Sequence, residues 1–181
     1  SGFTILFLFW TITMLAKKLV KNKEEMTLGQ MIAIFASGVV GSLAYTFSDT
    51  FWYSAVESEV YAMSSCFTAI SFWAILKWEA EADDKHNLRW LILIAFLIGI
   101  SIGVHLLNLL AIPAITYVFY FKKYPNVEKN KKRNFILVGI ISMLLVAIIL
   151  YFIVPYIVIF AGKFEIFFTN SIGLPFNTGT I

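Results

Sequence analysis

Long uncharged runs alternate with short charged segments along this chain. An α-helix needs about 20 mainly apolar residues to cross the roughly 30 Å hydrocarbon core of a bilayer. The pattern therefore predicts an all-α fold, a polytopic transmembrane helix bundle that forms a single domain over residues 1–181. The expected helices lie at about 3–16, 28–47, 60–78, 90–103, 106–121 and 135–160.

One of these runs is too long to be a single straight span. Residues 90–121 carry no formal charge apart from one on His105 when it is protonated, and as one helix of 32 residues they would extend about 48 Å. Small and polar residues interrupt the run between Gly99 and Asn108. We predict a broken helix pair, a hairpin, around residues 99–108.

The charged segments predict the topology. The segment KKLVKNKEE has four Lys and two Glu, and KKYPNVEKNKKR has six Lys or Arg and one Glu. Basic loops favour the cytoplasmic side of a membrane. A hairpin at 99–108 places the second basic loop on the same side as the first, whereas a single span would place the two loops on opposite sides. Segments 48–59, 103–108 and 161–181 are then expected to face outward.

The composition agrees with an integral membrane protein, because 60% of the residues are apolar, 14% are charged and the mean hydropathy is +0.82. One cysteine, Cys66, excludes a disulfide framework or a thiolate metal site built from this chain alone. The net charge of +3 comes mainly from the two basic segments, so we expect contact with membrane lipids and no nucleic-acid binding. The first residues, SGFTILFLFW, lack an initiator Met and a basic leader, as expected for an internal fragment of a longer protein.

Small residues recur every four positions in two of the expected helices. One row is Ala33, Ser37 and Gly41, and the other is Ala95, Gly99 and Gly103. Such rows allow close helix approach in lipid, so they indicate packing rather than chemistry.

The segment 48–59 carries acidic residues between two apolar runs. Asp49, Tyr53, Glu57 and Tyr61 are spaced by four and share one face if the segment is helical, whereas Glu59 points away. SAVE, which ends at Glu57, matches a capping box ahead of the next apolar run, so Glu57 is a cap, a site residue or both. Asp49 has the same two interpretations, and no capping role is evident for Glu59 or Tyr61.

His105 and Asn108 stand in the long apolar run, where polar groups either pair within the bundle or serve function. Broken helices often mark binding sites, and a free helix N-terminus can bind a phosphate. The substrate-binding candidates are Glu57, Glu59, Tyr61, Asp49, His105 and Asn108. The chain contains no P-loop, dinucleotide fingerprint or G-x-S-x-G motif, and neither a metal ligand set nor a catalytic residue can be named.

Two long motifs carry a resemblance to a known family. They are FSDTFWYSAVESEVYAMSSCFTAISFWAILKWE and RWLILIAFLIGISIGVHLLNLLAIPAI. The chain closely resembles large multi-pass membrane proteins abundant in Bacteroidetes, the family of the domain of unknown function 2723. Nearly the whole chain is covered, and Glu57, Glu59 and Tyr61 fall in VESEVYAM while His105 and Asn108 fall in IGVHLLN.

The resemblance implies a GT-C-like glycosyltransferase related to protein O-mannosyltransferases. Such enzymes transfer a sugar from a polyprenyl-phosphate carrier to a protein or glycan acceptor on the extracytoplasmic side, here of the bacterial inner membrane. A divalent metal cofactor is left open. The family carries its acidic catalytic loop upstream, so the fragment is expected to be inactive alone, with its catalytic base outside residues 1–181.

Two other classes of function remain open. A broken helix with a histidine at the membrane midplane is also typical of transporters and of lipid-handling proteins. A non-catalytic membrane scaffold would not gather its outward polar residues around a cavity. The depth of His105 separates the first alternative from the transferase, which needs this side chain near the outer interface.

Overall fold

The computed structural model describes residues 1–20, 26–57, 60–125 and 131–179. Throughout these ranges the chain is helical or in turns, with no strand, which confirms the predicted all-α fold. In chain order the elements are α1 (Gly2–Leu19), α2 (Leu28–Thr46), α3 (Asp49–Val56), α4 (Tyr61–Ala80), α5 (Leu88–Val104), the 3₁₀ helix η1 (Leu106–Leu110), α6 (Ala111–Lys123), α7 (Lys131–Ile148), the π-helical turn η3 (Ile149–Ile153), α8 (Val154–Ile166) and the π-helical turn η4 (Phe167–Ile172).

Three helical stretches are long and apolar enough to cross a membrane: α1, α2 and the 42 residues Lys131–Ile172 that contain α7 and α8. α3 and α4 pass the same test as one bent pair, and α5, at 17 residues, is a shorter apolar helix. α2 begins with a capping box, in which Gln30 N donates to Thr27 Oγ1 at 3.3 Å and Thr27 N donates to Gln30 Oε1 at 3.0 Å. Satisfying these terminal groups fixes where α2 starts.

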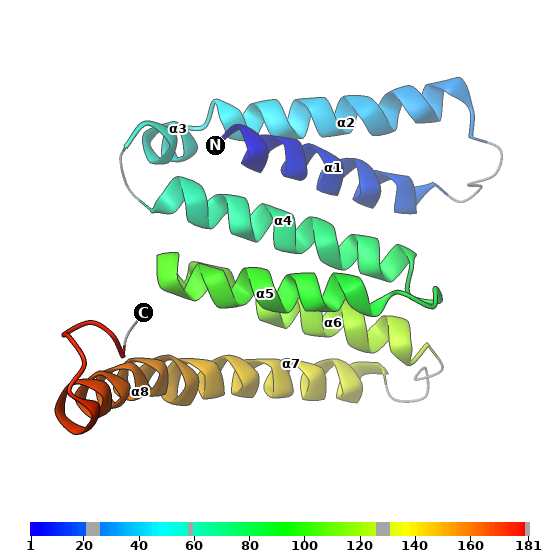
Figure 1. Ribbon diagram of the computed structural model, residues 1–181. Coiled ribbons are helices and arrows are strands. Elements are labelled where there is room, and N and C mark those ends of the chain that lie inside the picture. The colour runs from blue at the N-terminus through cyan, green and yellow to red at the C-terminus, as the bar shows by residue number, and fades with distance from the viewer. Residues whose placement is uncertain (21–25, 58–59, 126–130, 180–181) are drawn as a thin grey trace.

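α4 lies at the centre of the bundle (Figure 1). α1 packs against α2 and α4, whereas α5 and α6 pack against α4 from the other side and α7 packs against α6. One buried cluster, with Ile75, Trp78 and Ile94, joins α4 to α5, and a second, with Ile112 and Val146, joins α6 to α7. The bundle is therefore a layer of helices whose middle member has neighbours on both sides.

Large apolar side chains remain exposed along the outer helices. Phe35 on α2 and Ile141 on α7 are 63% and 58% exposed, and many residues around them share this exposure. A soluble protein rarely leaves such continuous apolar faces open, but hydrocarbon solvates them well. This surface suits a multi-pass membrane protein.

The two ends of the bundle carry different segments of the chain (Figure 1). At one end, Lys18 of α1 pairs with Glu79 of α4, and Lys122 of α6 pairs with Asp83 of the α4–α5 loop. α3, the α5–η1 turn and η4 lie at the opposite end. The described parts of the predicted outward segments thus lie at one end, and the described parts of the basic segments lie at the other. Which end faces the cytoplasm stays a prediction.

A carboxylate organises the loop between α4 and α5. Glu81 accepts hydrogen bonds from Trp90 Nε1 at 2.7 Å and from Arg89 Nη2 at 2.6 Å. These bonds, that of Trp90 foremost, hold the pKa of the Glu81 carboxyl below its usual value because they favour its charged form. The loop is thereby tied to the first turn of α5.

The predicted packing row on α5 is wrong, and the row on α2 is right only at Gly41, where a Cβ would lie 2.7 Å from Ile12 Cδ1 of α1. Ala33 and Ser37 are exposed, and a closer approach of α1 to α2 occurs at Gly38, where a Cβ would lie 2.5 Å from Thr13 Cγ2. A Cβ on Gly99 or Gly103 would have no atom within 4 Å outside its own helix. The inward face of α5 instead contains Ile94, Leu97 and Ser101.

The C-terminal helical stretch departs from the expected boundary at residue 160. It continues through α8 and η4 to Ile172, so part of the segment 161–181 is helical rather than an irregular outward loop. Beyond it, Glu165 accepts from the backbone N–H of Gly179 at 3.0 Å. This contact folds the last described turn back onto α8.

Candidate functional site

The break in the long apolar run lies at His105 itself. α5 continues through Gly99 and Gly103 to Val104, and His105 then adopts an extended conformation with φ −164° and ψ 136°. Its N–H closes α5 by donating to Ser101 O at 2.7 Å. The predicted broken pair is confirmed, with the histidine rather than the glycines at the point where the chain turns.

His105 uses one ring nitrogen to start the next element. Its Nδ1 accepts a hydrogen bond from Leu107 N at 3.1 Å, so the side chain acts as the N-cap of η1. Because Nδ1 accepts, a neutral imidazole carries its proton on Nε2, which is then a hydrogen-bond donor. This hydrogen bond thus fixes the orientation of the ring and leaves its Nε2–H as the group that can bind a ligand.

Tyr61 lies beside this imidazole. Their ring centroids are 5.3 Å apart, at an interplanar angle of 55°. Tyr61 begins α4 and His105 follows α5, so the contact joins the two candidate motifs identified in the sequence. These two candidates are brought together at the end of the bundle that also carries α3 (Figure 1).

Asn108 has a different place from the other candidates. It is fully buried, and its Nδ2 donates to Ser101 Oγ at 3.0 Å, whereas its Oδ1 has no partner in the described part of the chain. Ser101 is on α5 and Asn108 is on η1, so this bond ties together the two sides of the break. The structure therefore gives Asn108 a positioning role within the turn.

The capping box predicted at Glu57 is wrong. Ser54 lies inside α3, where its Oγ donates to Thr50 O at 2.8 Å, and Glu57 is the C-terminal cap residue of the same helix. The N-cap of α3 is Ser48, whose side chain accepts from Phe51 N. Glu57 is exposed at the end of α3 and available to another group.

The proposed face of Asp49, Tyr53, Glu57 and Tyr61 does not form. α3 ends at Val56, and the axes of α3 and α4 differ by 116°, so Tyr61 belongs to another helix direction. Asp49 and Tyr53 do share α3, with Asp49 in its first turn, where a carboxylate is stabilised by the helix dipole. Glu59, the remaining acidic candidate, lies outside the described residues.

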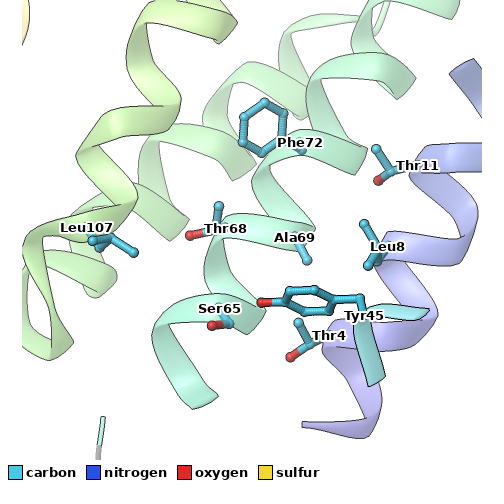
Figure 2. A pocket seen from close by; sticks show the side chains of 9 residues that line it. All are labelled: Thr4, Leu8, Thr11, Tyr45, Ser65, Thr68, Ala69, Phe72 and Leu107. Atoms are coloured by element: carbon cyan, nitrogen blue, oxygen red, sulfur yellow. The ribbon is translucent and has the colours of Figure 1, made fainter. Parts of the chain in front are cut away.

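A cavity of about 280 Å³ opens between α1, α4 and η1. Its walls are largely apolar, with Leu8, Phe72 and Leu107 among them, and hydroxyl groups are set into them (Figure 2). The hydroxyl-bearing residues are Thr4, Thr11, Tyr45, Ser65 and Thr68. The ring of Tyr45 reaches from α2 across the space towards α4 (Figure 2).

The cavity adjoins the pair of Tyr61 and His105. Ser65 is one turn along α4 from Tyr61, and Leu107 follows His105 by two residues. Thr4 in the wall is 2% exposed, and its Oγ1 has no hydrogen-bond partner among the described residues. The space can therefore hold an elongated apolar group and hydrogen-bond it at its polar end.

These lining hydroxyls were not among the candidates predicted from the sequence. Single Thr and Ser residues in apolar helices commonly bond to the preceding turn, as Thr11 Oγ1 does to Phe7 O at 2.7 Å, and so attract little attention. A usable signal was the concentration of such residues, Ser64, Ser65, Thr68 and Ser71, within three turns of α4. A helix that faced only lipid would not need them.

No three His, Cys, Asp or Glu side chains of residues 1–20, 26–57, 60–125 and 131–179 lie close enough together to hold a metal ion.

Comparison with known proteins gives one match. The family model described as the protein O-mannosyl-transferase TMEM260 N-terminal domain matches residues 1–128, a range that contains α1 to α6 and the whole candidate site. No curated protein and no solved structure matches the chain.

Proposed function

We propose, from the premise that this chain belongs to the protein O-mannosyl-transferase TMEM260 N-terminal domain family, that it is part of the membrane core of a glycosyltransferase. In this proposal the enzyme takes a sugar from a polyprenyl-phosphate carrier and transfers it to an acceptor, a protein above all, on the extracytoplasmic side. In a bacterial protein of the family of the domain of unknown function 2723, the site would lie on the outer side of the inner membrane.

The observation that carries the proposal is the apolar cavity beside Tyr61 and His105. A polyprenyl phosphate has an apolar chain that ends in a charged group, so its site must join an apolar wall to hydrogen-bond donors at the membrane interface. The cavity supplies the wall for the isoprenoid units near the phosphate. The Nε2–H of His105 and the hydroxyl of Tyr61 supply donors at its polar end.

Each remaining candidate has a defined part in the proposal. Asn108 holds the α5–η1 turn that presents His105. Glu57, and Glu59 on the same connection, would orient hydroxyls of the sugar or the acceptor, and Asp49 would lie at the edge of that region. The catalytic base is assigned to a segment outside residues 1–181.

The position of His105 favours a transferase over a transporter. His105 follows the last residue of α5, at the end of the bundle, rather than interrupting a helix at mid-depth. A scaffold is disfavoured because polar side chains from several helices gather around one cavity.

The test uses the full-length enzyme that contains these residues. We expect His105→Ala to lower kcat/KM for sugar transfer from the polyprenyl-phosphate donor by about tenfold or more, because a hydrogen bond to a charged group is lost. His86→Ala is the matched control, since this second histidine is exposed in the loop at the other end of the bundle. A correctly inserted His105→Ala enzyme with unchanged kcat/KM would refute the assignment.

A further inference from the structure

A second cavity, with charged side chains in its wall, lies at the opposite end of the bundle from His105, between the last turns of three helices. Its volume is about 510 Å³. Lys17 and Lys18 of α1, Lys122 of α6 and Glu79 of α4 line it, and Met14 and Leu76 form an apolar part of its wall. We call it the lysine cavity.

The charges of the lysine cavity do not balance. Three ammonium groups face a single lining carboxylate, Glu79, which pairs with Lys18. Lys122 Nζ lies 3.1 Å from Asp83 Oδ2, but the Asp83 side chain is 93% exposed and such a surface pair is weak. Within the described residues Lys17 has no ion pair. Among the described residues, the lining therefore carries an excess of positive charge, which would attract an anion.

The bundle places this cavity at the level of lipid headgroups. α1, α4 and α6 end within a few residues of it, at Leu19, Ala80 and Lys123, so it lies where these apolar helices leave the hydrocarbon. A neighbouring hollow of about 360 Å³ shares Met14 and is lined by Trp10 and Trp73 deeper in the same two helices, together with Thr13 and Lys77. The lysine cavity thus adjoins a groove that has two Trp rings in its wall.

We propose that the lysine cavity binds the phosphate of an anionic phospholipid, with the upper part of an acyl chain in the groove of Trp10 and Trp73. Basic pockets between membrane helices select such headgroups. A free phosphate would use the same lysines but would gain nothing from the apolar wall of Met14 and Leu76. This site is separate from the cavity at His105 and does not depend on the glycosyltransferase proposal.

The test measures binding of phosphatidylglycerol to the full chain in a neutral detergent, by native mass spectrometry. We expect Lys17→Gln to raise the Kd about fivefold, and Lys17→Gln with Lys122→Gln about 25-fold, since each lysine near the surface contributes about one such factor. The matched control is Lys85→Gln, which removes the same charge from an exposed loop position at the same end. Its Kd should equal that of the wild type.

A variant with the opposite sign guards against general loss of structure. Glu79→Gln removes the carboxylate that competes for Lys18, so it should tighten phosphatidylglycerol binding. Phosphatidylcholine, which has no net charge, should bind more weakly, and millimolar inorganic phosphate should not displace the lipid. The proposal would be overturned if Lys85→Gln weakened phosphatidylglycerol binding as much as Lys17→Gln, or if Glu79→Gln had no effect on it. It would also be overturned if phosphatidylcholine bound as tightly as phosphatidylglycerol, or if inorganic phosphate displaced the lipid.

Discussion

At the residue scale, the break between α5 and η1 depends on a short hydrogen-bonded chain. Asn108 donates to Ser101 Oγ, which in turn donates to Ile98 O at 2.8 Å, and His105 Nδ1 accepts from Leu107 N. The bond from Leu107 N satisfies a backbone group at the break, and the bond between Asn108 and Ser101 connects the two sides of the break in an apolar environment. Two polar residues that look alike in the sequence, His105 and Asn108, therefore have different roles: one faces Tyr61 and the other holds the turn.

This division can be tested at Ser101. Replacing it with Ala leaves the buried Asn108 amide without an acceptor, so we expect the free energy of unfolding to fall by about 1–3 kcal/mol. Ser142→Ala is the matched control, because Ser142 is equally buried and bonds only to Gly139 O in its own helix. Unfolding of both variants in detergent with increasing SDS would compare them. Equal losses for the two would contradict a special role of Ser101.

At the element scale, the sequence predicted where helices exist better than how they pack. The uncharged run at 90–121 exceeds the bilayer thickness, and this length alone predicted a break. Helix faces could not be predicted from apolar periodicity, because lipid and protein interior are both apolar and α5 is hydrophobic all round. Of the predicted row on α2, Gly41 does approach α1, whereas Ser37 lies one position from the closer contact at Gly38.

The contact of α1 with α2 gives a direct test of this correction. We expect Gly38→Val to destabilise the purified chain by about 1–3 kcal/mol, because the added side chain would overlap Thr13 and Phe9 of α1. Gly99→Val, in a mid-helix position with free space, should be neutral or stabilising, since glycine is a poor helix former. Thermal unfolding of the two variants would decide it. If Gly99→Val were the more harmful, the predicted row on α5 would be right after all.

At the scale of the whole molecule, the bundle separates two kinds of chemistry. The contact of Tyr61 with His105 and the hydroxyl-lined cavity lie towards one end, and the lysines and their carboxylates lie at the other. Both candidate motifs were visible in the sequence, but the pair of side chains that touches, Tyr61 and His105, was not, because it depends on how α4 packs against α5. The cavity was still less accessible to prediction, since four separate segments contribute its walls.

The hairpin of α5 and α6 predicts a pattern of accessibility across the membrane. In a Cys66→Ala background, we expect Lys85→Cys and Tyr124→Cys to react with an impermeant maleimide from one side, and Tyr53→Cys from the other. All three positions are exposed. Sealed vesicles of known orientation would provide the measurement. Reaction of Tyr124→Cys from the same side as Tyr53→Cys would mean that residues 88–123 cross only once.

The π-helical turns in the last helical stretch affect how this protein can be compared with others. A π turn holds about one residue more than an α turn, so the helix beyond it is rotated by about 100° relative to an unbroken α-helix. A helical wheel drawn continuously from Lys131 would therefore assign the residues of α8 to the wrong side after η3. An alignment with a relative that keeps a plain α-helix needs a one-residue gap within 149–153. Without this gap, residues on one side of α8 would be matched with residues on another side of the relative's helix.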